Sequence, residues 1–238
     1  MSQKIIEGIV LQKIDYSESS LIIKALTREQ GVQSFIFQGA KRKNKRGNLI
    51  SPLSILSIEY YQRSDSQLAK ISSVEPALVY RSIPFDPYKS GILFFMTEVL
   101  NKVVKEKESN EELFTFLRSI LEILDLSDHT ANFPIKFLLQ LTKYLGFYPQ
   151  MNADGLYFDL QESRFVKHLP NHPFYLDSEK TQILRLISTT KFDGKNDPII
   201  PLEIRRALIY DLLKYYQVII DHFEEVQSIS VLEATLHD

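Results

Sequence analysis

The sequence predicts an α+β protein of two domains, in which a five-stranded β-barrel is followed by a mainly α-helical domain with a small β excursion. Two changes along the chain carry this prediction. Up to residue 80, short segments rich in Ile, Val, Phe and Tyr alternate with polar loops, which is typical of strands. After Pro84 and Pro87 the apolar residues recur at helical spacing. We therefore expect domains at 1–80 and 81–238.

The first domain contains five predicted strands, a number that suits a small barrel. The loop 27–31 ends in Gly31, as hairpin loops often do. The segment 39–48 is polar and contains Gly39 and Gly47, so we expect an exposed loop. The predicted strands are Ile5 to Lys13, Ser20 to Leu26, Val32 to Gln38, Ile50 to Tyr61 and Ala69 to Val74.

The second domain contains five predicted helices around an apolar centre at 133–145. A capping box from Ser109 to Glu112 starts the second helix, and Gly146 ends the third. A β excursion at 154–166, inside an insertion at about 151–168, interrupts the helical pattern. The predicted helices are Tyr88 to Lys105, Ser109 to Leu124, Phe133 to Leu145, Ser178 to Ile187 and Leu202 to His222.

The composition excludes several protein classes. The chain has no cysteine, so neither disulfides nor thiolate metal sites can form, and a cytoplasmic location fits best. Charges interrupt the first residues before an apolar signal segment could form, and no uncharged apolar stretch reaches ~18 residues. We expect neither a signal peptide nor a membrane partner.

Charge is unevenly distributed, although the whole chain carries only −2. Residues 1–80 hold 11 Lys and Arg against 7 Asp and Glu, whereas residues 81–238 hold 17 against 23. A basic first part and an acidic remainder indicate polyanion contact in one domain and protein contact in the other. Ordinary variation between domains is the alternative.

A basic run at 41–46 is the strongest local signal for nucleic-acid binding. Five of its six residues are cations, and neutralising phosphates is the main source of sequence-independent DNA affinity. A solvated loop that only improves solubility is the alternative. Strand alternation leaves Tyr61 on the outer face as a possible stacking platform for a base, whereas Phe35 and Phe37 are expected in the core.

Catalysis is poorly supported, and we predict that the chain is not an enzyme. Glycine-rich nucleotide-binding patterns, the G-x-S-x-G elbow and H-E-x-x-H are all missing from the sequence. His168 and His172 have the spacing of helical metal ligands, but Pro170 and Pro173 argue against a helix there. We expect these histidines in a surface loop, with no metal or other cofactor.

Several segments resemble the RecO family of bacterial recombination mediators in order and spacing. The match begins with Gly8-Ile9-Val10-Leu11 and continues through Asp15-Tyr16-Ser17-Glu18-Ser19-Ser20-Leu21, Thr27-Arg28-Glu29-Gln30-Gly31, Gly39-Ala40-Lys41-Arg42, Ser51-Pro52-Leu53 and Val74-Glu75. The helical half contributes Phe137-Leu138-Leu139, Leu145-Gly146-Phe147-Tyr148-Pro149 and Gln227-Ser228-Ile229-Ser230-Val231-Leu232.

The resemblance implies an OB-fold for the first domain and a role in DNA repair without nucleotide hydrolysis. It implies binding to single- and double-stranded DNA, annealing of complementary strands, and loading of RecA onto DNA coated by single-strand-binding protein, together with RecR. It also implies a nucleoid-associated location. Many family members carry a four-cysteine zinc module after the Gly-Phe-Tyr-Pro segment. Here 151–166 lacks cysteine, so packing of Leu156, Phe158 and Phe165 is expected to replace the metal.

These considerations predict two sets of site residues. Phosphate contacts are assigned to the basic run and to nearby cations, with Tyr61 for stacking: Lys41, Arg42, Lys43, Lys45, Arg46, Lys24, Arg28 and Arg63. The helical domain is expected to bind the acidic, apolar C-terminal tail of single-strand-binding protein through Lys136, Arg205 and Arg206, with Lys143 and Lys214 in reserve. Ordinary helix decoration is the alternative for this second set. Two rival functions remain: a protein-interaction adaptor without a DNA role, and a nucleic-acid enzyme with an OB-fold.

Overall fold

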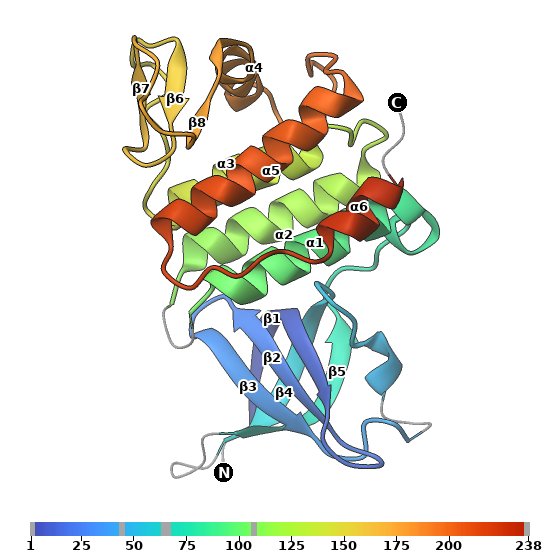
Figure 1. The fold of residues 1–238 in the computed structure, drawn as a ribbon. Helices are drawn as coiled ribbons and strands as arrows, with labels where there is room; N and C mark the ends of the chain where they lie inside the picture. The colour runs from blue at the N-terminus through green and yellow to red at the C-terminus, as the bar shows by residue number, and fades with distance from the viewer. Residues whose placement is uncertain (1–2, 43–45, 63–67, 106–108, 236–238) are drawn as a thin grey trace. The chain divides into compact units, whose positions relative to one another are not determined.

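A computed structural model of the protein describes residues 3–42, 46–62, 68–105 and 109–235 (Figure 1). The chain divides into two compact units, one formed by 1–81 with 99–122 and the other by 82–98 with 123–238. The boundary at residue 80 stays a prediction. Within the described ranges, no helix combines the length and the apolar character needed to cross a membrane.

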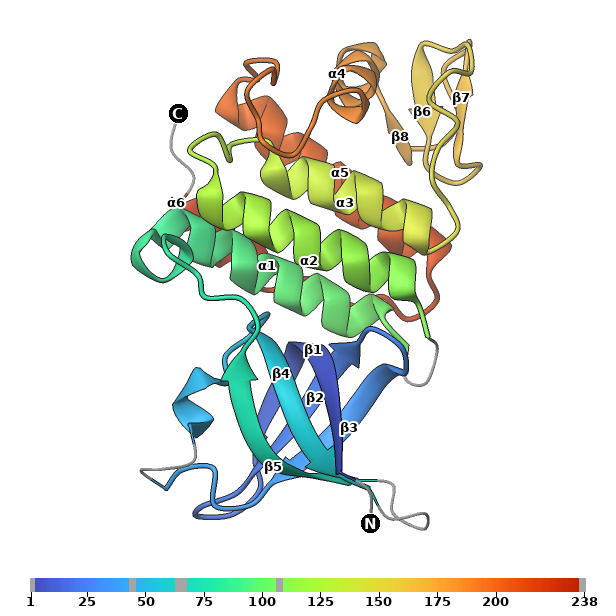
Figure 2. The same ribbon diagram turned by 180° about the vertical axis from the view of Figure 1, so that it is seen from behind.

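The first unit contains a closed five-stranded barrel in the order β1-β2-β3-β5-β4, which confirms the predicted fold class. The pairs β1–β2, β2–β3, β1–β4 and β4–β5 are antiparallel. The pair β3–β5 is parallel. Figure 2 shows β4 and β5 from behind. The strands are β1 (Gln3–Asp15), β2 (Leu21–Thr27), β3 (Gly31–Phe37), β4 (Ile55–Tyr61) and β5 (Ala69–Pro76).

Closure of the barrel depends on the length and curvature of β1. Its first half pairs with β4 and its second half with β2. The register shifts between Val10 and Gln12, and such a bulge bends a strand and increases its twist. At Gly8 a Cβ would lie 3.1 Å from Ile58 Cδ1, so glycine allows the strands to approach closely.

The barrel core follows the predicted alternation. Tyr60 is buried while Tyr61 lies on the outer face, and Phe35 and Phe37 are both in the core. The Phe35 and Tyr60 rings meet edge to face, 5.3 Å apart. The predicted fourth strand was wrong at its start, because β4 begins at Ile55. A short 3₁₀ helix, η1 (Gly47–Leu49), ends just before the predicted start of the strand, and Leu53 has a left-handed backbone (φ 53°), so the chain is not extended there.

Two helices contribute residues to both units: α1 (Pro87–Val103) and α2 (Glu111–Leu126), with the short η2 (Ile83–Phe85) ahead of them. The predicted capping box at the start of α2 was wrong. Asn110 Oδ1 accepts the backbone N–H of Leu113 at 2.8 Å, and the Ser109 hydroxyl donates instead to the Glu29 carbonyl. The Asn side chain is one residue closer to the helix and supplies the cap.

The second unit has the predicted apolar centre in α3 (Phe133–Tyr144), which is buried over most of its length. It lies beside α5 (Leu202–Ile219), whose Tyr216 hydroxyl donates to the Leu138 carbonyl at 2.8 Å (Figure 1). Gly146 follows α3 with a φ of 87°, as predicted for its cap. The other helices are α4 (Ser178–Ser188) and α6 (Ile229–Thr235), of which α6 was not predicted.

The predicted β excursion forms a small sheet in the order β7-β6-β8, made of β6 (Tyr157–Asp159), β7 (Arg164–Val166) and β8 (Tyr175–Leu176). Phe158 and Phe165 are buried with their rings 5.0 Å apart, but Leu156 is 60% exposed, so its predicted core role was wrong. Arg185 makes further contacts with this segment that the sequence did not predict. Its guanidinium lies 3.8 Å from the Phe165 ring and donates to the Met151 and Ala153 carbonyls at 2.5 and 2.6 Å.

Candidate functional site

A cationic cavity opens at one end of the barrel, between the β1–β2 hairpin and the loop that follows β3. Its volume is about 580 Å³. We name it the barrel-end cavity. It is lined by Lys13, Asp15, Leu21, Ala40, Lys41, Arg42, Gly47 and Asn48.

Backbone hydrogen bonds hold the walls of the barrel-end cavity. The Lys41 N–H donates to the Ser19 carbonyl at 3.2 Å, and the Gly47 N–H donates to the Ala40 carbonyl at 3.1 Å. A Cβ at Gly47 would lie 2.2 Å from that carbonyl oxygen, so only glycine allows this approach. The backbone at the two ends of the loop is thereby tied together.

The charges in this cavity are only partly matched. Lys41 forms an ion pair with Asp15 at 2.8 Å, and Lys13 Nζ donates to the Ile50 carbonyl at 3.1 Å. The hydrogen bond and the charge of Lys41 lower the pKa of Asp15. Arg42 forms no ion pair with the part of the chain that the structure describes. An anion would therefore meet an excess of positive charge.

The structure brings together part of the predicted DNA-contact set. Lys41 and Arg42 line the barrel-end cavity, and Arg46 follows in an exposed position where it pairs with Glu75 at 3.0 Å. Lys43, Lys45 and Arg63 lie outside the described residues.

Three further members of that set lie elsewhere on the first unit. Lys24 is half-buried on β2, and Tyr61 is half-buried at the end of β4. Arg28 pairs with Glu7 at 3.3 Å and lies 5.0 Å from the Phe114 ring, so its charge already has a structural use.

Sequence reasoning missed Lys13 as a member of the cavity. The signal was present, because Lys13 and Asp15 are two residues apart in one strand and residues at that spacing share a face. The sequence did not show that Asp15 meets Lys41, which follows 26 positions later in a loop. That contact depends on how β1, β2 and β3 pair.

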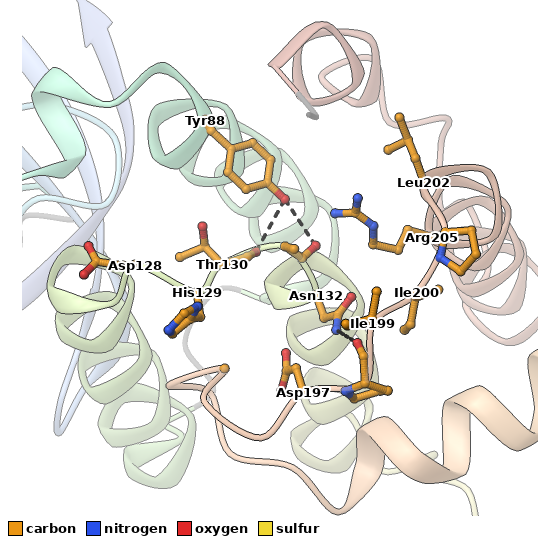
Figure 3. A pocket seen from close by; sticks show the side chains of 14 residues that line it. Tyr88, Asp128, His129, Thr130, Asn132, Asp197, Ile199, Ile200, Leu202 and Arg205 are labelled. Carbon is orange, nitrogen blue, oxygen red and sulfur yellow. Dashed lines mark hydrogen bonds between the residues drawn. The ribbon is translucent and has the colours of Figure 1, made fainter. Parts of the chain in front are cut away.

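A second pocket, of about 500 Å³, lies in the second unit around the start of α5 (Figure 3). We name it the Arg205 pocket, because the Arg205 guanidinium points into it although the residue is only 5% exposed. One wall is apolar, with Ile199, Ile200 and Leu202. The remaining lining residues are Tyr88, Asp128, His129, Thr130, Ala131, Asn132, Gly194, Asp197, Pro198 and Pro201.

Polar contacts shape the opposite wall of the Arg205 pocket. Burial raises the pKa of Tyr88 to about 12, and its hydroxyl donates to the Ala131 carbonyl at 3.2 Å. Asn132 donates to the Pro198 carbonyl at 3.0 Å and ties the two loops of the pocket together. Figure 3 shows both interactions.

Lys136 has a structural role that differs from its predicted one. Its ammonium is buried, pairs with Asp197 and donates to the Lys191 carbonyl at 2.5 Å. It therefore does not offer an exposed charge to a peptide. Lys136 also neutralises Asp197, which lines the Arg205 pocket.

The other predicted partner-binding cations are not among the residues that line the Arg205 pocket. Arg206 pairs with Glu203 at 3.4 Å on the same helix. Lys143 is exposed near the end of α3, and Lys214 is exposed on α5 with its ammonium 5.3 Å from the Phe174 ring.

The histidines do not assemble into a metal site where the chain is described. His168 is exposed, whereas the His172 ring lies 3.2 Å from a carboxylate oxygen of Asp159. Over residues 3–42, 46–62, 68–105 and 109–235, no three His, Asp or Glu side chains come close enough together to hold a metal ion.

Comparisons with known proteins cover both units. Residues 1–80 match the family described as "Recombination protein O N terminal" and residues 84–224 match "Recombination protein O C terminal". The chain is 34% identical over 232 residues to the DNA repair protein RecO of Flavobacterium psychrophilum, a match that covers 95% of this chain and 96% of that protein. Identity is 32% to the RecO protein of Flavobacterium johnsoniae, over the same shares of both chains. It is 30% to that of Phocaeicola vulgatus, over 98% of each.

Proposed function

Because the chain belongs to the RecO family of DNA repair proteins, we propose that it acts as a recombination mediator that binds single- and double-stranded DNA and anneals complementary strands. In this proposal it works with RecR to help RecA onto DNA covered by single-strand-binding protein. It does so at the nucleoid in the cytoplasm, and it neither hydrolyses a nucleotide nor catalyses another reaction.

The observation that carries the DNA-binding part of the proposal is the barrel-end cavity. Lys13, Lys41 and Arg42 converge there on a backbone that hydrogen bonds hold in place. Ammonium and guanidinium groups neutralise phosphates irrespective of base identity, so binding is led by the backbone of the nucleic acid and is weakly sequence-selective. Arg46, Lys43, Lys45, Lys24, Arg28 and Arg63 extend the positive surface in this proposal, and Tyr61 offers a ring for stacking.

The test of DNA binding is a salt titration with oligonucleotides of several sequences. Replacing Lys41 and Arg42 by Ala should weaken binding to all of them alike, and each lost phosphate contact should flatten the log–log salt slope by up to about 0.7 on single strands. The control replaces two exposed lysines that are not among the cavity lining residues, Lys4 and Lys105. An unchanged slope in the Lys41/Arg42 variant would exclude this cavity from DNA binding.

The partner-binding part of the proposal places the tail of single-strand-binding protein in the Arg205 pocket. Such a tail ends in an apolar residue with a free carboxylate. The apolar wall suits that side chain, and the planar guanidinium of Arg205 can bind a carboxylate through two parallel hydrogen bonds. Asp197 does not oppose the acidic tail, because Lys136 already neutralises it.

The test of this part is calorimetry with an acidic peptide that ends in an apolar residue. Arg205→Ala should weaken binding well over tenfold, since removing one partner of a desolvated charge pair costs ~2–5 kcal/mol. Arg205 is buried, so Arg205→Ala could weaken binding by destabilising the fold. A second variant, Ile199→Asp, avoids this problem because Ile199 is fully exposed. The new carboxylate on the apolar wall should repel the acidic peptide. Lys214→Ala and Lys143→Ala are controls outside the pocket. Equal affinity in all four variants would contradict the proposal.

The rival function is an adaptor that contacts only proteins and has no DNA role. It makes a different prediction in the same experiments, because peptide binding would persist while no oligonucleotide bound at any salt concentration.

A further inference from the structure

We propose that Asp15 is a built-in competitor for the phosphate that enters the barrel-end cavity: its carboxylate holds Lys41 in the free protein and is displaced from it by the nucleic acid. This inference rests on the proposed DNA binding and adds its regulation. It assigns a function to an acidic residue that neither the basic run nor the overall charge of the domain would suggest.

The placement of Asp15 supports this role. It is the last residue of β1 and lines the same cavity as Lys13, Lys41 and Arg42. Its carboxylate lies 2.8 Å from Lys41 Nζ, within direct ion-pair distance. Both side chains remain accessible, with 72% of Asp15 and 41% of Lys41 exposed. An entering anion can therefore reach the ammonium without unfolding any part of the barrel.

The chemistry of the pair makes the exchange one for one. A carboxylate and a phosphodiester each carry a single negative charge and oxygen acceptors, so one replaces the other at the same ammonium. Solvent-exposed ion pairs contribute only ~0.2–1 kcal/mol, which a phosphate held at the same time by neighbouring cations can outweigh. After the exchange the Asp15 charge stays beside the phosphate and repels it. Asp15 thus weakens the complex, which suits a protein that must release the strands it pairs.

The exchange also has a signature in the salt dependence of binding. A free lysine that neutralises a phosphate causes the release of counterions from DNA. When Lys41 leaves Asp15 to do so, the liberated carboxylate takes up a cation from solution, and the two effects partly cancel. The wild type should therefore show a shallower salt slope than a variant in which the competitor is missing.

The experiment measures binding of the full chain to oligo(dT) by fluorescence anisotropy at several salt concentrations. Asp15→Asn keeps the shape of the side chain and should bind about two- to fivefold more tightly at moderate salt, with the slope steeper by up to about 0.7. In a Lys41→Ala background the same change should have little effect on the slope. Melting curves establish that each variant is folded.

The matched control is Glu29→Gln, which also removes one negative charge. Glu29 is exposed in the turn between β2 and β3, at the end of the barrel opposite the β1–β2 hairpin. It should change the affinity less and leave the slope unaltered. If both variants bind equally more tightly, the effect is one of net charge and the inference fails.

The outcomes separate this inference from the function on which it rests. Wild-type binding with a negative salt slope, together with an Asp15→Asn variant that behaves identically, would overturn the competitor role and leave DNA binding intact. Absence of binding in the wild type and in every variant would overturn both.

Discussion

At the scale of single residues, burial decides what a cation does. Lys136 and Arg205 are both basic residues on helices of the second unit, and both are almost completely buried. Lys136 has a carboxylate partner in Asp197, so its charge stabilises the fold. The Arg205 guanidinium points into the Arg205 pocket (Figure 3), where we propose that it binds a ligand carboxylate. The difference lies in what each side chain faces.

The buried pair of Lys136 and Asp197 leads to a stability prediction. Lys136→Met should destabilise the protein by ~3–5 kcal/mol, because it leaves the charge of Asp197 buried without its partner. The free energy of unfolding from urea titration measures the loss.

The control for this prediction is Lys143→Met, which removes an exposed lysine of the same helix and should change stability little. Adding Asp197→Asn to Lys136→Met should recover part of the loss, since both charges are then gone. A Lys136→Met variant as stable as the wild type would show that the pair contributes nothing.

At the scale of elements, Arg185 on α4 organises the segment between α3 and the small sheet. Its guanidinium contacts the Phe165 ring of β7 and carbonyl groups of the loop at 151–155. Gly155 allows the loop to lie close against β7, because a Cβ there would be 2.6 Å from the Val166 nitrogen. A side chain from one helix thus holds two segments that have little regular structure of their own.

The role of Arg185 is testable by hydrogen exchange. Arg185→Met should speed amide exchange in β6 and β7 and lower the unfolding free energy by ~1–3 kcal/mol, because hydrogen bonds from a charged donor and a cation–π contact are lost. Gln182→Ala, an exposed change on the same helix, is the control. Unaltered exchange in β6 and β7 would refute the role.

Metal removal tests how the segment 151–166 is held together. Because the segment 151–166 has no cysteine, we expect no stoichiometric zinc, and chelators should leave the melting temperature unchanged. Metal analysis that finds one zinc per chain would contradict this.

At the scale of the whole molecule, the two candidate sites belong to different units and different chemistries. The barrel-end cavity is lined by residues of the first unit and the Arg205 pocket by residues of the second. The net charges of 1–80 and 81–238 have opposite signs, which agrees with a polyanion ligand for the first site.

We therefore predict that the two binding activities can be removed separately. The Lys41→Ala/Arg42→Ala variant should lose most of its DNA affinity and keep its peptide affinity, and Ile199→Asp should do the reverse. Anisotropy and calorimetry on the same preparations make the comparison. If either change weakened both activities by the same factor, then either both ligands bind at one site or the variant is misfolded, and the prediction would be wrong.

The sequence by itself determined the features that depend on local periodicity. Alternation of period two placed Tyr60 and Phe35 in the barrel core, helical spacing placed α3 at the centre of the second unit, and Gly146 marked its end. The basic run marked the loop whose Lys41 and Arg42 line the barrel-end cavity, and DNA contact by these residues stays a prediction. These signals need only near neighbours in the chain, because strand and helix geometry repeat over a few residues.

Tertiary structure alone decided which partner each charge has. Asp15 meets Lys41, Lys136 meets Asp197, and Arg185 meets carbonyls more than thirty residues away in the chain. No periodicity links such positions, because their contacts arise only when β1, β2 and β3 pair or when α3, α4 and the intervening loops pack. A charge costs free energy to bury unless a partner is present, so these distant partners determine whether a basic residue stabilises the fold or stays available to a ligand.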